Sequence, residues 1–177
     1  ADGFLHIRAI AVARRQISDA CLEKGRGAKG IYTLTVPTGG GKTLAALRFA
    51  LAHAVKHHGT DSPVERIIYV IPYTSIIDQN AERVRQILET EADAGKIVLE
   101  CHSNLSEERE SWLGGLLSEN WDAPIVFTTN VQFLETLFAG GTKAVRKLHN
   151  LANSVIIFDE IQETPNALKA LKYFYEN

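Results

Sequence analysis

The hydrophobic positions of the chain follow two alternating patterns, helical spacing and short apolar runs. Between residues 5 and 24, apolar side chains recur near helical spacing, which predicts a helix that Gly25 can end. An Ala- and Leu-rich stretch at 42–58 predicts a second helix, which closes on basic residues and a glycine. Further helices are predicted at 75–88, 106–120, 130–138 and 142–150, and from Pro165 onward.

Short runs rich in β-branched and aromatic residues separate these helices. The run at 66–71 is almost continuously apolar, as in strands that are covered on both faces of a parallel sheet. Strands are predicted at 31–36, 66–71, 97–101, 125–129 and 155–159. Because each of these strands is followed by a helix, the sequence predicts an α/β fold with a parallel sheet and helices on both faces.

A glycine-rich loop separates the first predicted strand from the helix that follows it. Its residues are Thr38, Gly39, Gly40, Gly41, Lys42 and Thr43. Glycines let backbone N–H groups approach phosphate oxygens closely, and the next helix presents the positive end of its dipole to them. Lys42 would bridge the β- and γ-phosphates of ATP, and the Thr43 hydroxyl would coordinate Mg²⁺. Val36 stands where the full P-loop pattern has a glycine, so a glycine-rich turn with an incidental lysine is the alternative.

Two adjacent carboxylates, Asp159 and Glu160, follow the last predicted strand. The carboxyl end of a strand is where open α/β sheets bind ligands. Asp159 can hold Mg²⁺, usually through water, and Glu160 can orient and deprotonate the attacking water. A guanine-binding motif is incomplete at 142–145 and the signature of transporter ATPases is absent, which favours an ATPase that moves along a polymer.

Four segments make the chain similar to the superfamily 2 DExD/H-box helicases. These segments are 36–43, 72–80, 128–135 and 159–162. They resemble, in that order, the first motif (in which the early glycine is commonly replaced), motifs Ia and Ib, and the DExD/H box. In that wording, and at 102–104 and 146–150, the chain resembles the CRISPR-associated helicase-nuclease of type I systems, which degrades foreign DNA.

The resemblance implies that 1–177 is the first RecA-like domain of a P-loop NTPase motor, with ATP and Mg²⁺ clamped between it and a second such domain. Within it, 1–30 would be an N-terminal helix and loop, 31–162 the core, and 163–177 the start of the next helix. The second domain, its arginine finger and a nuclease domain are expected outside this chain, so the chain alone should hydrolyse ATP barely or not at all. An Ala at position 1 and the lack of Met fit a piece of a longer protein.

The resemblance also implies roles for individual residues. The catalytic residues would be Lys42, Asp159, Glu160 and Gln162. Gln162 would relay the state of the nucleotide towards the face that contacts DNA. Gln16 falls where the family often has a glutamine that contacts adenine, and a polar residue on a helix surface is the alternative.

Motifs Ia and Ib fall at strand-to-helix turns, where hydroxyls and helix N-terminal amides can bind successive phosphates of single-stranded DNA without reading its bases. The predicted nucleic-acid contacts are Thr74, Ser75, His102, Thr128, Thr129 and Asn130. For Thr74 and Thr129, capping of the following helix is an equal alternative, because the same residue types perform it.

Composition limits the partners and the compartment. The net charge of −2 supplies no global positive field, so nucleic-acid binding has to rest on local donors. No apolar run reaches the roughly 20 residues of a membrane span, and two cysteines make no disulfide framework, so a cytoplasmic protein without membrane contact is expected. His53 and His57 have metal-ligand spacing, but without a third ligand they are predicted to lie on a solvated helix surface.

The predicted function is therefore that of an ATP-dependent DNA helicase or translocase, which feeds foreign DNA to a nuclease in CRISPR antiviral defence. An RNA-guided CRISPR surveillance complex would be its partner. One alternative is another superfamily 2 motor, such as an RNA helicase or a restriction-type translocase. The other is a non-enzymatic nucleotide-binding interaction module, against which Glu160 argues, because a scaffold has no need of a general base.

Overall fold

The chain divides into two compact units, which we call the helical unit (Ala1–Val64) and the sheet unit (Glu65–Asn177). The computed structural model describes residues 2–37, 39–102, 120–138, 142–161 and 169. None of the helices in these ranges has the length and apolar character of a membrane span. The helices predicted at 106–120 and from Pro165 onward lie outside the described residues, apart from single positions.

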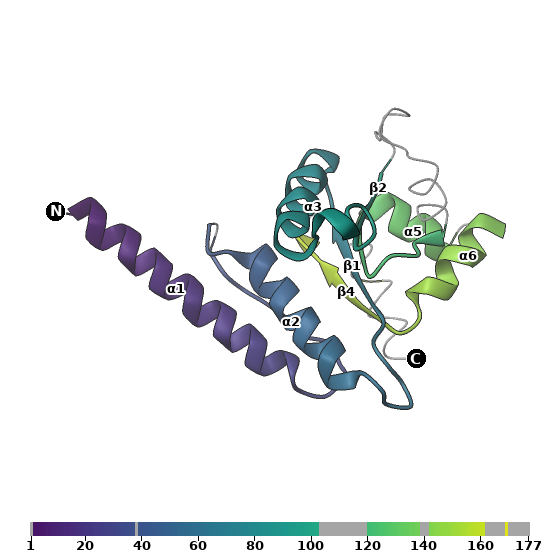
Figure 1. The fold of residues 1–177 in the computed structure, drawn as a ribbon, viewed down its shortest axis with the longest axis horizontal. Coiled ribbons are helices and arrows are strands. Elements are labelled where there is room, and N and C mark those ends of the chain that lie inside the picture. Colours follow the sequence, from purple (N-terminus) through teal and green to yellow (C-terminus); the bar gives the residue numbers. More distant parts are fainter. Residues whose placement is uncertain (1, 38, 103–119, 139–141, 162–168, 170–177) are drawn as a thin grey trace. The chain divides into compact units, whose positions relative to one another are not determined.

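Two helices, α1 (Asp2–Gly25) and α2 (Lys42–His57), lie side by side in the helical unit (Figure 1). Their bounds confirm the two helices that the sequence predicts there. The close approach explains Gly25, because a Cβ at this position would lie 2.5 Å from the carbonyl oxygen of Phe49 and 2.9 Å from Cβ of Ala52. A larger residue would push the two helices apart.

The pair His53 and His57 is part of this packing and not, as the sequence analysis predicted, a solvated surface. His53 is 5% exposed, and its Nδ1 lies 2.9 Å from the carbonyl oxygen of Gly25. His57 Nε2 lies 3.2 Å from the carbonyl oxygen of Gly27. The prediction was wrong because helical spacing alone did not reveal that this face of α2 meets the end of α1. Burial lowers the pKa of His53.

The segment at 31–37 carries no regular secondary structure, so the strand predicted at 31–36 is not formed. Ile31 is 66% exposed, and Tyr32 and Leu34 are exposed as well. A strand needs a hydrogen-bonded neighbour, and the described part of the helical unit contains no other strand. The composition of this segment favours a strand, but the described residues of the helical unit provide no second strand with which it could form hydrogen bonds.

The sheet unit holds a parallel four-stranded sheet in the order β2-β3-β1-β4, which confirms the predicted α/β class. The strands are β1 (Arg66–Ile71), β2 (Val98–Cys101), β3 (Ile125–Thr129) and β4 (Ser154–Phe158). Thr128 pairs with both Cys101 and Val70, and Val70 pairs with Phe158. The carboxyl ends of all four strands therefore meet at one edge of the sheet.

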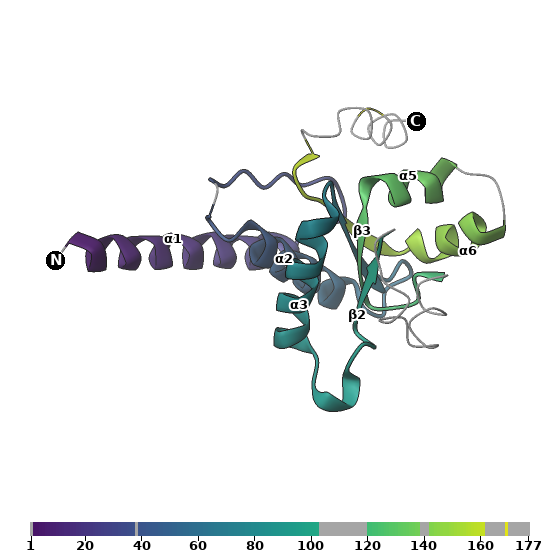
Figure 2. The same cartoon turned by 90° about the horizontal axis from the view of Figure 1, so that it is seen from above.

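Helices cover both faces of this sheet, as predicted (Figure 2). One face carries α3 (Thr74–Leu88), which the short 3₁₀ helix η1 (Glu91–Asp93) follows. The other face carries α5 (Asn130–Phe138) and α6 (Thr142–Leu151).

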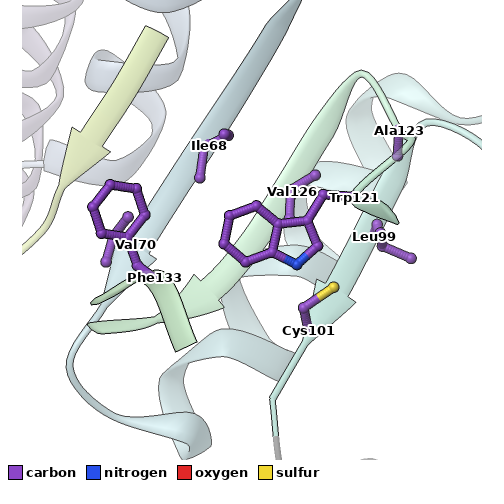
Figure 3. Packing of buried hydrophobic residues seen from close by; sticks show 8 residues of the cluster. All are labelled: Ile68, Val70, Leu99, Cys101, Trp121, Ala123, Val126 and Phe133. Carbon is purple, nitrogen blue, oxygen red and sulfur yellow. The ribbon is translucent and has the colours of Figure 1, made fainter. Parts of the chain in front are cut away.

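A hydrophobic cluster lies between the sheet and the pair α5 and α6 (Figure 3). Its members are Ile68, Val70, Leu99, Cys101, Trp121, Ala123, Val126 and Phe133. On the opposite face, the rings of Tyr69 and Phe127 stack with centroids 5.1 Å apart. Because alternate residues of β1 enter opposite cores, the strand is apolar at nearly every position. Each fully buried large side chain contributes about 1.5–3 kcal/mol, which fixes the sheet beneath the turns at its carboxyl edge.

Candidate nucleotide and nucleic-acid site

The glycine loop adopts a conformation that only glycine readily takes. Gly39 and Gly41 have φ angles of 79° and 81°, in the left-handed region. Gly41 is the N-cap of α2 and offers no side-chain oxygen to the first N–H groups of that helix. Lys42 and Thr43 are the first two residues of α2, and both are half-buried. This is the arrangement in which a helix N-terminus accepts an anion.

Gly40 is required for a different reason, namely close packing against the residue that departs from the P-loop pattern. A Cβ at Gly40 would lie 2.3 Å from Cγ1 of Val36 and 2.9 Å from the carbonyl oxygen of Pro37. The N–H of Gly40 donates to the same Pro37 oxygen at 3.0 Å. Val36 and Gly40 therefore fit each other, and the loop closes as a tight turn. Thr38 lies outside the described residues.

Arg14, which the sequence analysis missed, contacts this loop from α1. Its Nε and Nη2 both donate to the carbonyl oxygen of Gly39, at 2.9 and 2.7 Å. Nothing in the sequence separates Arg14 from Arg15, which points elsewhere and lies 4.0 Å from Asp19. Gln16 is exposed on α1. Its contact with adenine stays a prediction.

The acid pair follows β4 in a defined turn of the sheet unit. The N–H of Asp159 donates to the carbonyl oxygen of Val70 at 2.9 Å, which extends the strand ladder by one residue. Glu160 has φ of 48°, and its N–H donates to Oδ1 of Asp159 at 3.1 Å. A left-handed non-glycine residue costs about 1–3 kcal/mol and persists only where its surroundings impose it. The backbone of the two acidic residues is thus held at the carboxyl edge of the sheet. Gln162 lies outside the described residues.

The candidate contacts of motif Ia begin α3 at the carboxyl end of β1. The cap of α3 is Tyr73, which makes no side-chain cap hydrogen bond, and Thr74 is the first helical residue. N-capping by Thr74 is therefore not the arrangement in the structure. Thr74 is half-buried and Ser75 is exposed. Binding of a DNA backbone phosphate at the N-terminus of α3 stays a prediction.

The candidate contacts of motif Ib lie where β3 ends and α5 begins. Thr128 is fully buried, and its hydroxyl donates to the carbonyl oxygen of Cys101 at 3.1 Å. Thr129 accepts the N–H of Gln132 at 3.2 Å, so this hydroxyl does cap α5. Asn130 is 6% exposed, and its amide nitrogen and oxygen have no hydrogen-bond partner within the described ranges. The hydroxyls of Thr128 and Thr129 are thus already hydrogen-bonded, whereas the side-chain amide of Asn130 could still bind a ligand.

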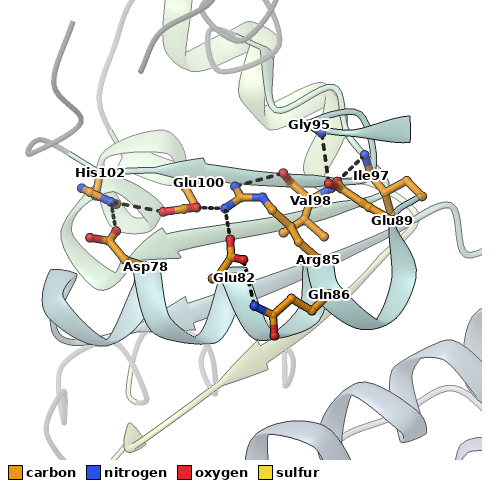
Figure 4. A network of polar contacts seen from close by, with 10 residues as sticks. All are labelled: Asp78, Glu82, Arg85, Gln86, Glu89, Gly95, Ile97, Val98, Glu100 and His102. Carbon is orange, nitrogen blue, oxygen red and sulfur yellow. Dashed lines mark hydrogen bonds and ion pairs between the residues drawn. The ribbon is translucent and has the colours of Figure 1, made fainter. Parts of the chain in front are cut away.

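His102 is not an open surface donor but part of a polar network (Figure 4). It is 7% exposed, and its Nε2 lies 2.8 Å from Oδ1 of Asp78. Glu100 is equally buried and hydrogen-bonds Arg85 through Oε1. Burial raises the pKa of Glu100, nearby Asp78 adds to the rise, and the Arg85 guanidinium opposes it. A contact from His102 to DNA would have to compete with Asp78.

Comparison with known proteins agrees with the motifs and the fold. Residues 14–170 match the model of the DEAD/DEAH box helicase family. Over 171 residues the chain is 34% identical to the CRISPR-associated nuclease/helicase Cas3 of Haloferax volcanii, an alignment that covers 86% of this chain and 18% of that relative. The chain thus spans less than a fifth of the relative's length. With a parallel α/β sheet of the kind found in RecA-like domains, the chain belongs to the DEAD/DEAH box helicase family.

Proposed function

We propose that the chain is the ATP-binding first motor domain of an ATP-dependent DNA helicase or translocase that delivers foreign DNA to a nuclease in CRISPR defence. Family membership supports the motor, and similarity to a relative whose name joins nuclease and helicase supports the context. The observation that carries the nucleotide-binding part is the start of α2, where left-handed Gly41 provides no side-chain cap for the first amides of the helix and Lys42 follows directly.

In this proposal the glycine loop binds the phosphates and Gln16 contacts the adenine. The phosphate-binding residues are Thr38, Gly39, Gly40, Gly41, Lys42 and Thr43. Lys42 neutralises the β- and γ-phosphates, and the hydroxyl of Thr43 ligates Mg²⁺. Backbone amides and a lysine are the donors that a triphosphate requires, and the helix dipole adds to them.

Asp159 and Glu160 have different roles in the proposed hydrolysis of ATP. Asp159 anchors Mg²⁺ through water, and Glu160 takes the proton of the water that attacks the γ-phosphate. The left-handed turn at Glu160 supports this proposal, since backbone strain of this kind concentrates at functional positions. Gln162 would transmit the state of the nucleotide to the DNA-binding residues.

Single-stranded DNA would lie along the carboxyl edge of the sheet, contacted through its backbone. The proposed contacts are Thr74, Ser75, His102, Thr128, Thr129 and Asn130. This placement is supported by Ser75, which is exposed, and by the amide of Asn130, which has no hydrogen-bond partner in the part of the chain that the structure describes. The buried Thr128 and His102 would position the turns unless they reorient on binding.

A second RecA-like domain, a nuclease domain and an RNA-guided surveillance complex would complete the machine in the cytoplasm. In this proposal the second domain supplies an arginine finger, which is worth on the order of 10³–10⁵ in rate, so we expect almost no hydrolysis from residues 1–177 alone.

The test is the ATPase activity of the parent protein with single-stranded DNA or RNA of the same sequence. The proposal predicts strong stimulation by DNA and little by RNA. Equal or greater stimulation by RNA would favour an RNA helicase instead. Nucleotide binding without any stimulated turnover would favour an interaction module.

A further inference from the structure

One imidazole and two carboxylates converge within the sheet unit at the carboxyl end of β2 (Figure 4). Glu100 is in β2, His102 follows it directly, and Asp78 lies one turn into α3. The ligand atoms of the three side chains all lie within 4.8 Å of one another. His102 and Glu100 are each 7% exposed, whereas Asp78 reaches solvent. Two buried side chains and one exposed side chain therefore bring three potential metal ligands close together.

Hydrogen bonding alone leaves this cluster incomplete. Nε2 of His102 lies 2.8 Å from Oδ1 of Asp78 and 3.8 Å from Oε2 of Glu100. A ring nitrogen carries at most one proton, so it can donate to only one of the two oxygens. Among the described residues, the buried Oε2 of Glu100 has no hydrogen-bond partner. A buried carboxylate oxygen without a donor is costly, so among the described residues a further positive partner at this oxygen would stabilise Glu100.

Arg85 holds Glu100 in place without filling that gap. Its Nη1 binds the other oxygen of Glu100, and its Nη2 donates to the carbonyl oxygen of Val98 at 3.3 Å. The same guanidinium lies 3.9 Å from Glu82. Two carboxylates, those of Glu100 and Glu82, thus lie beside one guanidinium. Oε2 of Glu100 stays turned towards His102 (Figure 4). Orienting a metal ligand through its second oxygen is a common feature of metal sites.

We propose that Asp78, Glu100 and His102 bind a divalent transition-metal ion, with zinc as the best match. One imidazole nitrogen and two carboxylate oxygens form a donor set that zinc accepts. With metal–ligand bonds of about 2.0–2.1 Å in a tetrahedral arrangement, two ligand atoms lie about 3.3 Å apart. The observed separations of 2.8 and 3.8 Å lie on either side of that value. The exposure of Asp78 leaves a fourth position for water or another ligand.

A bound ion would join two elements that start from different strands. Asp78 lies on α3, which follows β1, and is four residues after Thr74, whereas His102 is the first residue after β2. The ion would fix the first turns of α3, which carry the proposed motif Ia contacts. The site itself does not depend on the proposed helicase function, because zinc binding is measured without nucleotide or DNA.

The experiment is a calorimetric titration of ZnCl₂ into the chelator-treated chain 1–177. We expect one equivalent to bind, and Asp78→Asn and His102→Gln each to weaken the affinity by about 10–100-fold or more. Asp78 is exposed, so Asp78→Asn keeps the test valid even where His102→Gln fails to fold. His57→Gln is the matched control, since it removes an imidazole with metal-ligand spacing elsewhere, and its zinc affinity should equal that of the unsubstituted chain.

Thermal unfolding gives a second readout from the same samples. Zinc should raise the Tm of the unsubstituted chain and of His57→Gln, but not that of Asp78→Asn. A zinc affinity weaker than about 100 μM would overturn the proposal. So would an affinity that is unchanged in both Asp78→Asn and His102→Gln. A plain hydrogen-bonded cluster would give no zinc-dependent shift of Tm.

Discussion

Substitution of Gly40 by Ala tests whether the fit between Gly40 and Val36 shapes the glycine loop for nucleotide. The added Cβ would lie 2.3 Å from Cγ1 of Val36 and 2.9 Å from the carbonyl oxygen of Pro37. Carbon atoms pack at about 3.5–4.0 Å, so a shift of roughly 1 Å is needed. Val36 is β-branched and turns poorly about χ1, so the loop backbone has to give way.

Overpacking of this size costs about 1–3 kcal/mol. If the strain distorts the phosphate-binding amides, the affinity for Mg²⁺-ATP should fall about 5–150-fold. Isothermal titration calorimetry of the chain 1–177 measures it, beside urea unfolding to separate lost binding from lost folding.

The double variant Val36→Ala/Gly40→Ala supplies the control. It removes Cγ1 but keeps the contact with Pro37, so we expect partial recovery of the affinity, with a coupling energy of about 0.5–3 kcal/mol. Wild-type affinity in Gly40→Ala would show that the nucleotide site tolerates a Cβ at position 40. A double variant that binds no better than Gly40→Ala would show that the clash with Val36 is not the cause.

Three further predictions follow from the described contacts. Arg14→Ala should weaken Mg²⁺-ATP binding, because Gly39 loses both hydrogen bonds, whereas Arg15→Ala should not; equal effects of the two in calorimetry would contradict this role. In the parent protein, Glu160→Gln should lower ATP hydrolysis about 10²–10⁴-fold and spare binding, whereas Asp159→Asn should raise the Mg²⁺ concentration needed for half-maximal turnover; identical Mg²⁺ titrations would refute the assignment. His53 has a lowered pKa, so the unfolded chain binds more protons below about pH 6.5 and the free energy of unfolding should fall as the pH drops through that value. Urea unfolding at about pH 7 and pH 5.5 should show a smaller loss in His53→Gln, and an unchanged loss would exclude His53 as the source.

The sequence predicted those elements whose pattern is strong over their whole length. The strands at 66–71 and 125–129 and the helix at 130–138 have the predicted bounds, because apolar runs and Pro72 mark their ends. The strand at 31–36 failed for a physical reason, since propensity is local and pairing is not. The described residues of the helical unit offer this β-rich segment no strand to pair with.

Within the candidate site too, the features that depend on neighbouring residues were predicted, and those that depend on packing were not. The glycine loop was recognisable because its chemistry depends on consecutive residues, and Gly39 and Gly41 take the left-handed angles that only glycine readily accepts. Arg14 lies 25 positions from its partner Gly39, and His102 lies 24 positions from Asp78. Contacts between residues this far apart depend on how the helices and strands pack, so no local sequence pattern predicts them. For the same reason, the sequence named His102 as a surface contact although packing buries it.

Binding of Mg²⁺-ATP by the loop at 39–43 is tested by comparing Lys42→Ala with the unsubstituted chain in calorimetry. Lys42 would make a charge-assisted contact worth about 1.5–3 kcal/mol, so the affinity should fall about 10–100-fold. Lys56→Ala, which removes an exposed lysine from the last turn of α2, should leave the affinity unchanged. Equal affinities of Lys42→Ala and the unsubstituted chain would show that the loop does not bind the phosphates of ATP through Lys42.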